Sequence, residues 1–382
     1  MRLSMSVLAS VAVVVVAAPL SLFAQVVQQH VTGLRAPTRL LSQPDGSLLV
    51  AEAGAGPNTG RVSLVDRDAR VATVIDGLPS GLYGAAQEPS GPSGLLLLER
   101  RVFILIGGGG AALQRPNGVE VANPDKASPL LSSVLLLEFD EDADVLPLGF
   151  VLTPDRHARV AAGDGVYLVN ADGVGARLSR LVDFPDTTPE PRPDEPANVR
   201  ASNPFNLVGS DAHLDVVDAS RNLLWRVRTG NPQAEPFVRF PPVPNTTPIG
   251  PPVVDAVPAS VRADGDSLLV SYLTGFPFGA GAARVVRVNR VTGETTVVAS
   301  GLQTAIDALP LGDGRRLLVL EYSTNFLAGA PGRLLLIDDP SRAPLVLADT
   351  LVQPTSMAID PRSGDVFVSE TGTGRIMRVL VP

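Results

Sequence analysis

The sequence predicts an all-β protein, a six-bladed β-propeller, and three observations support this. Gly (36 residues) and Pro (35 residues) are abundant while 45% of the chain is hydrophobic, which is typical of many short strands joined by turns. A unit of about 45 residues recurs along the chain. Within each unit an Asp- or Gly-containing turn separates two apolar strands, which is a hairpin signal.

The turn and the strand that follows it recur six times. The clearest copies are Pro44–Val50, Ala263–Val270, Gly312–Val319 and Ser363–Val368, and looser copies are Ser210–Val217 and Glu99–Ile106. A further apolar strand, often opened by Arg, follows in most units, for example Arg61–Val65 and Arg333–Ile337. Four short strands in each of six units predict radially arranged blades, which protect sheet edges without disulfides.

The predicted ring is closed by the start of the mature chain. The last unit, Val352–Pro382, contains only three strands, and Gln25–Leu34 resembles the fourth-strand endings Val74–Leu78 and Val297–Leu302. We therefore expect the mature N-terminal strand to complete the last blade.

One long segment does not follow the repeat. Leu148–Phe184 contains a further strand pair, around Val166–Val169 and Ala176–Leu181. We interpret it as an elaboration of blade 2, and a seventh blade is the alternative. Two Pro-rich segments, Pro185–Pro204 and Pro241–Pro258, are expected to be extended surface loops.

The first 24 residues have the pattern of a signal peptide. Arg2 precedes an apolar run, Val7–Ala18, and Ala24 provides a small residue before a cleavage site at Gln25. The apolar run is short for a membrane span, and an uncleaved anchor is the alternative. The prediction is therefore one propeller domain, 25–382, that is secreted or periplasmic, with no membrane span after cleavage.

Charge and cysteine content exclude several classes of function. The net charge of −8 argues against nucleic acid, which requires basic surfaces. The chain has no cysteine, so it has no disulfides and no thiolate chemistry. The three histidines, His30, His157 and His213, fall at unrelated repeat positions. With no catalytic triad or metal spacing in view, a non-enzymatic role is favoured.

Two sets of carboxylates have structural interpretations. Asp140, Asp142 and Asp144 alternate, but the Gly and Glu of an EF-hand loop are missing, so we expect a solvated turn. A carboxylate also recurs at the end of the second strand in four units, often before an Arg that opens the third. These residues are Glu52, Asp218, Glu321 and Glu370, and we expect them to pair with that Arg or to hold a loop.

A variable position in the first strand of each unit is the candidate binding site. It follows a turn residue and one spacer, and its occupants are Arg39, Gly94, Asn206, Ser260, Asp307 and Ser356. Because the innermost strands of a propeller begin around the central channel, these residues are predicted to form a polar ring at its mouth. A water-filled channel with a polar lining is the alternative.

Two apolar loops between second and third strands are expected on the same face. Leu273–Ala280 supplies Phe276 and Phe278, and Tyr322–Ala328 supplies Tyr322. Exposed aromatic side chains suit a binding rim. The alternative is that they pack on each other and on the channel mouth.

Several stretches of the mature chain form a recognisable set: Gly91–Ser93, Ser202–Leu207, Ser271–Phe278 with Ala283–Val285, and Pro354–Arg378. In these stretches the chain resembles the ScyD/ScyE family of secreted propeller proteins. The resemblance covers nearly the whole mature chain and is weakest across Gly107–Pro196. It implies export and a propeller, and it implies no established reaction.

A second resemblance concerns the fold of six-bladed calcium-dependent lactonases, which hold a metal with Glu, Asn and Asp side chains. Asn206 and Asp307 match two such ligands, whereas Arg39 stands where an acid is expected and its charge opposes a metal. No cofactor is predicted otherwise. The leading hypothesis is a binding scaffold for a small molecule, glycan or protein, and a calcium-dependent hydrolase or lactonase is the alternative.

Overall fold

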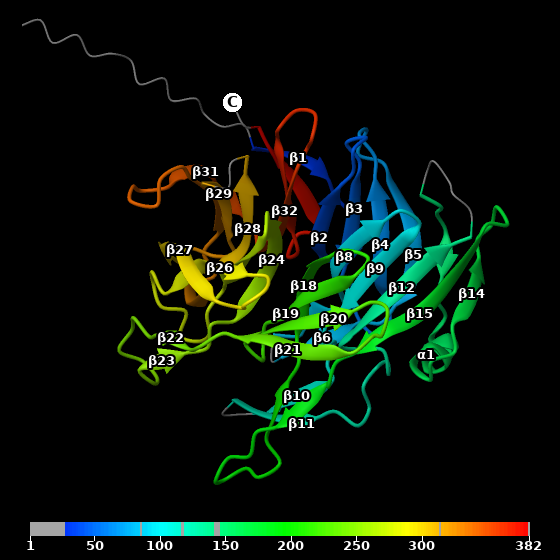
Figure 1. Cartoon of the computed structure of the whole chain (residues 1–382), viewed down its shortest axis with the longest axis horizontal. Coiled ribbons are helices and arrows are strands. Elements are labelled where there is room, and N and C mark those ends of the chain that lie inside the picture. The colour runs from blue at the N-terminus through cyan, green and yellow to red at the C-terminus, as the bar shows by residue number, and fades with distance from the viewer. Residues whose placement is uncertain (1–26, 85, 116–117, 141–145, 313–314, 381–382) are drawn as a thin grey trace, which may run out of the picture.

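The computed structural model describes residues 27–84, 86–115, 118–140, 146–312 and 315–380. Six sheets stand around a common axis and form a six-bladed propeller (Figure 1). The predicted fold class and blade number are therefore confirmed. The predicted signal peptide, residues 1–24, lies outside the described residues.

Each blade is an antiparallel sheet whose first strand is innermost. Blade 1 contains β2 (Pro37–Ser42), β3 (Leu48–Glu52), β4 (Gly60–Val65) and β5 (Val71–Leu78), and blade 2 contains β8 (Pro92–Leu98), β9 (Arg101–Ile106), β12 (Ser133–Phe139), β15 (Gly175–Asp183) and β14 (Val166–Val169). Blade 3 contains β18 (Pro204–Gly209), β19 (His213–Asp218), β20 (Leu223–Arg228) and β21 (Ala234–Arg239), and blade 4 contains β24 (Pro258–Asp264), β25 (Ser267–Tyr272), β26 (Ala283–Asn289) and β27 (Thr295–Leu302). Blade 5 contains β28 (Ala305–Leu311), β29 (Arg316–Glu321), β30 (Gly332–Ile337) and β31 (Leu345–Leu351), and blade 6 contains β32 (Pro354–Ile359), β33 (Val366–Glu370), β34 (Arg375–Val379) and β1 (Val27–Val31).

The N-terminal strand closes the ring, as predicted. Strand β1 pairs antiparallel with β34, so that Val27 lies opposite Val379. Figure 1 shows this blue strand beside the red strands of the C-terminal blade. Val31 and Leu34 are buried in a cluster with Phe367 of β33, which attaches the first strand to the last blade.

The Leu148–Phe184 segment elaborates blade 2, but it contributes more than the sequence suggested. Its strand β15 is the regular fourth strand of blade 2, and β14 is an additional outer strand. Before these, β13 (Phe150–Val151) pairs in parallel with β5 of blade 1, and the helix α1 (Pro154–Ala161) follows. Asp140 directly follows β12 and is exposed, whereas Asp142 and Asp144 lie outside the described residues.

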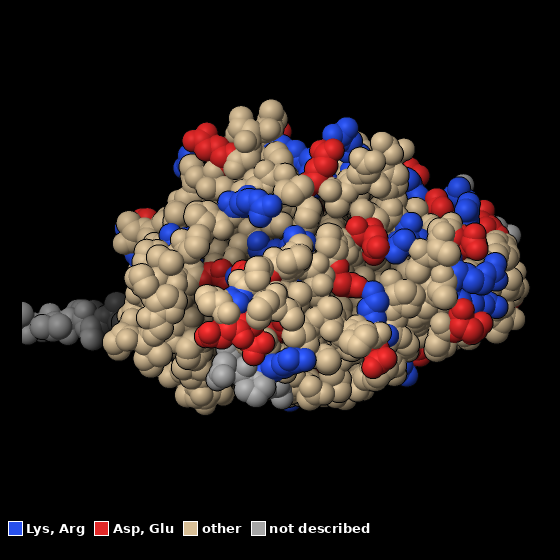
Figure 2. All heavy atoms as spheres, turned by 90° about the horizontal axis from the view of Figure 1, so that it is seen from below, with Lys and Arg blue, Asp and Glu red and all other residues tan. Residues whose placement is uncertain are grey.

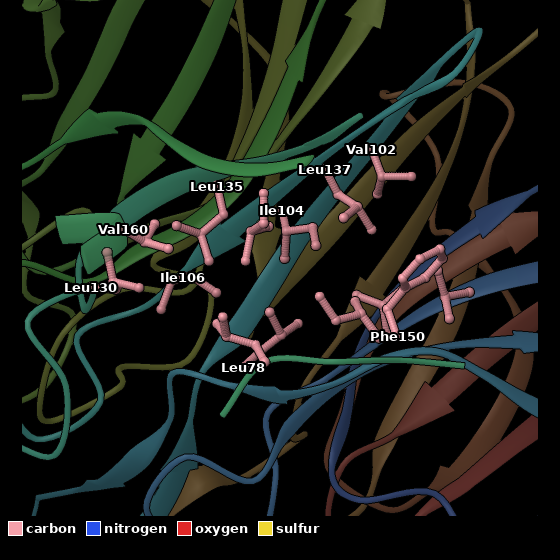
Figure 3. Packing of buried hydrophobic residues seen from close by; sticks show 14 of the residues in the cluster. Leu78, Val102, Ile104, Ile106, Leu130, Leu135, Leu137, Phe150 and Val160 are labelled. Atoms are coloured by element: carbon pink, nitrogen blue, oxygen red, sulfur yellow. The ribbon is translucent and has the colours of Figure 1, made fainter. Parts of the chain in front are cut away.

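The core lies between neighbouring blades. Figure 3 shows the cluster between blades 1 and 2, where Leu78 faces Ile104, Ile106, Leu135 and Phe150. Side chains of successive strand residues point to opposite faces of a sheet, and both faces of each blade are covered by its neighbours. This accounts for strands such as β9 and β29 that are apolar at nearly every position.

The recurring carboxylates bind the backbone just before the first strand in four of the six blades. Glu321 pairs with Arg333 and accepts the backbone N–H of Gln303 at 2.8 Å. Glu370 likewise pairs with Arg375 and accepts the N–H of Val352. Glu52 does the same with Arg61 and Arg35, and Asp218 accepts the N–H of Asn203. The structural role predicted for these four residues is confirmed.

Short hairpins decorate the face on which the innermost strands begin. They are β6 (Gly81–Tyr83) with β7 (Glu88–Ser90), β10 (Ala112–Arg115) with β11 (Val119–Ala122), β16 (Thr187–Pro189) with β17 (Val199–Ala201), and β22 (Val243–Pro244) with β23 (Val253–Val254). The last two lie within the Pro-rich segments, which are therefore partly paired and not simply extended. The short 3₁₀ helix η2 (Phe326–Ala328) lies in the loop between β29 and β30.

Figure 2 views the molecule from the side toward which β10–β11 and β22–β23 project in Figure 1. Acidic and basic side chains alternate there and do not gather into an area of one sign. No helix within the described ranges is long and apolar enough to cross a membrane.

Candidate functional site

All six innermost strands share one backbone irregularity. The register with the second strand shifts across the second residue, for example between Pro37 and Arg39 in β2. Such a bulge leaves one residue unpaired and redirects its side chain. The second and third residues of each inner strand therefore have different surroundings.

The third residues are the predicted polar ring, and the structure buries them. Arg39 is 5% exposed, Asn206 is 1% exposed, and Ser260, Asp307 and Ser356 are fully buried. At the sixth position, Gly94 approaches the backbone nitrogen of Leu207 in blade 3 so closely that an added Cβ would lie 3.2 Å from it.

Three of these side chains join neighbouring blades. Each accepts the backbone N–H of the residue after the ring position in the next blade, at 3.1 Å in every case: Asn206 from Val261, Asp307 from Met357, and Ser356 from Leu40. The inner edge of a blade has N–H groups without a strand partner, and these contacts satisfy them. The hydroxyl of Ser260 instead meets that of Ser271 within blade 4, at 2.9 Å.

Asp307 is the centre of a buried charge network that spans four blades. Arg262 of blade 4 binds both of its carboxylate oxygens, and Arg39 of blade 1 lies 3.6 Å away. Burial by itself would raise the pKa of Asp307, but the two guanidinium groups hold that pKa below its ordinary value. Burial and the charge of Arg262 lower the pKa of Arg39 to about 9. Two cations thus share one carboxylate beside the axis.

The two candidate calcium ligands do not fit an ion in this arrangement. The carboxylate of Asp307 is occupied by Arg262 and by the N–H of Met357. The carbonyl oxygen of Asn206 accepts the N–H of Val261. Calcium requires six to eight oxygen ligands, and no group of three or more His, Cys, Asp or Glu in the described part of the chain is placed to hold a metal.

The channel mouth is lined by the second residues of the inner strands, one position before the predicted ring. A cavity of about 360 Å³ lies there, which we call the mouth pocket. Five inner strands contribute the bulged residue to its wall: Thr38, Phe205, Ala259, Ile306 and Thr355. The equivalent residue of blade 2, Ser93, lines a smaller adjoining cavity.

The mouth pocket has a polar half and an apolar half. In blades 6, 1 and 2 the bulged residue is a hydroxyl that donates to the carbonyl of the first proline in the next blade: Thr355 to Pro37, Thr38 to Pro92, and Ser93 to Pro204. In blades 3, 4 and 5 it is apolar, and Val257, Leu273 and Ala219 extend that wall.

The predicted aromatic residues pack on each other at the rim, which was the alternative interpretation. Phe278 stacks on Phe326 with ring centroids 4.0 Å apart, and Phe326 stacks on Tyr322 at 5.4 Å. Phe276 meets Phe278 edge-on and is 59% exposed. Tyr322 and Phe326 line the mouth pocket, so this row of aromatic rings connects the loops of blades 4 and 5 across its edge.

Several lining residues were not found from the sequence. Glu88 and Pro89 come from the β6–β7 hairpin, and Gln353, Thr371 and Gly372 come from loops of blade 6. No repeat position marks the hairpin, because it is an insertion. The bulged residues had a signal: they are the spacers that follow the first residue of each inner strand.

Comparisons with known proteins support the fold. No protein-family model and no curated protein matches the chain. A structural genomics protein of unknown function from Bacteroides thetaiotaomicron superposes with a TM-score of 0.50 at 10% identity, over 94% of this chain and 76% of that one. Virginiamycin B lyase from Staphylococcus aureus gives 0.48 at 14% identity, over 94% and 100%.

The gluconolactonase XC5397 from Xanthomonas campestris gives a TM-score of 0.48 at 11% identity, over 96% of this chain and 94% of that one. At these identities the likeness concerns the fold alone. The site of this chain therefore has to be interpreted from its own residues.

Proposed function

We propose that this protein is an exported binding protein of the ScyD/ScyE type that takes a small molecule into the mouth pocket. The observation that carries the proposal is the shape of that pocket. It lies on the axis, has a volume of about 360 Å³, and offers one apolar and aromatic wall and one hydroxyl-bearing wall. Small-molecule sites are concave, mostly apolar and supplied with a few convergent polar groups.

A small molecule fits this geometry better than the other partners predicted from sequence. A glycan or a protein would use a broad open surface, whereas the bulged residues that line the pocket are recessed: Thr38 and Thr355 are each 6% exposed and Ala259 is 2% exposed. We also propose that the protein is exported, because its first 24 residues have the pattern of a signal peptide. N-terminal sequencing of the protein isolated from the periplasm or the medium, starting at Gln25, would test it.

The binding proposal is tested with a pocket-filling variant. Ala259→Leu places three carbons in the cavity, and Ala171→Leu adds the same carbons to an exposed turn of blade 2 as a control. Small aromatic and aliphatic fragments would be titrated by calorimetry. We expect Ala259→Leu to weaken fragment binding about tenfold or more and Ala171→Leu to leave it unchanged. Equal binding by both variants would place the site elsewhere.

The alternative, a calcium-dependent lactonase, requires Asn206 and Asp307 to release their present partners. Metal analysis of the purified protein and a lactone hydrolysis assay with and without chelator would decide this point. Chelator-sensitive turnover that Asp307→Asn abolishes would favour the lactonase over the binding protein.

A further inference from the structure

The mouth pocket carries a single negative charge. Among the described residues that line it, Glu88 is the only one with an ionisable acid or base other than tyrosine, and no Arg, Lys or His joins it. Its side chain is exposed and has no hydrogen bond or ion pair with the described residues. Glu88 also lines two smaller cavities beside the pocket, one with Tyr322 and Gln353 and the other with Thr38 and Ser93, so it lies where the three spaces meet.

The hydroxyl groups of the pocket offer mainly lone pairs. Thr38 donates its proton to the carbonyl of Pro92 at 2.7 Å, and Thr371 donates to that of Pro37 at 2.8 Å. Thr355 also reaches the Pro37 carbonyl, at 3.1 Å. A hydroxyl has one proton and two lone pairs, so these three groups can accept hydrogen bonds from a ligand but have little to donate. These three hydroxyls therefore suit donors on a ligand, and the side-chain amides of Asn203 and Gln353, which also line the pocket, can both donate and accept.

An aromatic face lies close to the carboxylate. Tyr322, whose ring stacks with Phe326, lines the pocket together with Glu88. Glu88 and Tyr322 also both line a smaller cavity beside the pocket. Burial and the charge of Glu88 both raise the pKa of the Tyr322 phenol, so the phenol is neutral at pH 7. A cation beside a carboxylate and over an aromatic face is attracted by both.

We propose that the ligand of the mouth pocket carries an ammonium or guanidinium group, held by Glu88 and the aromatic face of Tyr322, with an apolar body against Phe205, Ala259 and Ile306. This inference rests on the proposed function. The cationic group is supplied either by a free amine or by a Lys or Arg side chain of a peptide.

The experiment compares three probes of similar size and different charge. They are 2-phenylethylammonium, 2-phenylethanol and 3-phenylpropanoate, titrated by calorimetry at pH 7 in low salt. We expect the ammonium to bind about tenfold more tightly than the alcohol, and the carboxylate to bind most weakly. Because Glu88 is exposed, this preference should shrink in 0.5 M salt. Nα-acetyl-lysine amide, as a fourth probe, distinguishes a peptide source from a free amine.

Two glutamate variants separate the pocket from the general charge of the protein. Glu88→Gln should bring ammonium and alcohol to within about twofold of each other. Glu294→Gln removes an exposed carboxylate between β26 and β27, at the end of blade 4 opposite the pocket, and should change nothing. If the alcohol binds as tightly as the ammonium, the cation inference is wrong while the proposed function stands. If no probe or fragment binds, both are wrong.

Discussion

The carboxylate of Asp307, on the innermost strand of blade 5, accepts the backbone N–H of Met357 in blade 6 at 3.1 Å and also binds the guanidinium group of Arg262 in blade 4. Arg262 also donates to the carbonyl of Met357 at 2.6 Å. One carboxylate and one guanidinium thus connect three blades next to the axis, where each inner strand would otherwise leave its edge unpaired. At this point ion pairing stabilises the contacts between blades, in addition to apolar packing.

Replacing Asp307 should therefore cost much of the stability. Asp307→Asn leaves Arg39 and Arg262 buried beside each other without a counter-charge, and breaking a buried pair in this way costs about 3–5 kcal/mol. Asp266→Asn, an exposed carboxylate on the β24–β25 turn, should stay within about 0.5 kcal/mol of wild type. Urea unfolding followed by circular dichroism measures both.

Arg39, the second arginine beside Asp307, allows the same charge network to be tested with a double variant. Its contact with Asp307 is 3.6 Å long and burial lowers its pKa, so it adds little to the pair and repels Arg262. In the Asp307→Asn background, Arg39→Met should recover part of the lost stability, about 1 kcal/mol or more. Further loss in the double variant would contradict this account of the network.

His157 should make stability depend on pH. Its side chain is 1% exposed, Nε2 donates to the carbonyl of Gly77 at 3.0 Å, and Nδ1 accepts from the hydroxyl of Ser128 at 2.9 Å. Burial lowers the pKa of His157, more than the Gly77 carbonyl and Asp155 raise it. The unfolded pKa of a histidine is about 6.5, and the folded pKa of His157 lies below it. As the pH falls from about 6.5 towards the folded pKa, the unfolded state binds the proton more readily, so the folded state loses stability.

The measurement is the free energy of unfolding at pH 7.5 and pH 5. The wild type should lose stability between them, and His157→Gln, which keeps a donor for the Gly77 carbonyl, should lose less. His30 also has a pKa lowered by burial and by Arg378, so a smaller loss should remain. An identical loss in both proteins would show that folding does not lower the pKa of His157.

The sequence was sufficient to predict the features that recur in each blade. It was insufficient to predict the segments inserted between the repeated strands. Asp45 and Gly46 form the expected turn: the Asp45 carboxylate accepts the N–H of Ser47 at 2.9 Å, and Gly46 adopts a φ of 87°. The Glu370–Arg375 pair was found in the same way. Glu88 was not found, because it lies in the β6–β7 hairpin, an insertion between blades 1 and 2 that belongs to no strand of the repeat.

The ring position was misplaced by one residue for a physical reason. The sequence pattern of a strand that starts at Pro37 does not show that Thr38 is left unpaired by a bulge. The hydroxyl of Thr38 instead contacts the Pro92 carbonyl of the next blade, and the sequence does not show that contact. The fourth strand of blade 2 was obscured similarly. It follows β12 only after β13, α1 and β14, so its distance along the chain hides its place in the sheet.

Closure of the ring by β1 gives a third prediction. Val31 is 6% exposed within the last blade, whereas Gln29 on the same strand points to solvent. Val31→Asp should cost about 3 kcal/mol or more, because it buries an unpaired charge, and Gln29→Asp should cost about 0.5 kcal/mol or less. Thermal unfolding compares them. Equal melting temperatures would mean that β1 adds little to blade 6.

The acid–arginine pairs predict a contrast between blades 5 and 4. In blade 5 the buried carboxylate of Glu321 is matched by Arg333. In blade 4 the equivalent arginine is Arg284, but the carboxylate position is occupied by Tyr272, and the buried Nε of Arg284 has no hydrogen-bond partner among the described residues. Arg333 therefore neutralises a buried carboxylate, whereas Arg284 has no carboxylate at the equivalent position.

The two arginines should respond differently to the same substitution. Arg333→Met leaves Glu321 buried and uncompensated, which costs about 3 kcal/mol or more. Arg284→Met removes a cation that lacks a paired acid, so it should cost less than about 1 kcal/mol, the methylene stem being retained as apolar packing. Urea unfolding of both variants at pH 7 gives the comparison. Equal losses of unfolding free energy would mean that the ion pair between Arg333 and Glu321 adds nothing to stability.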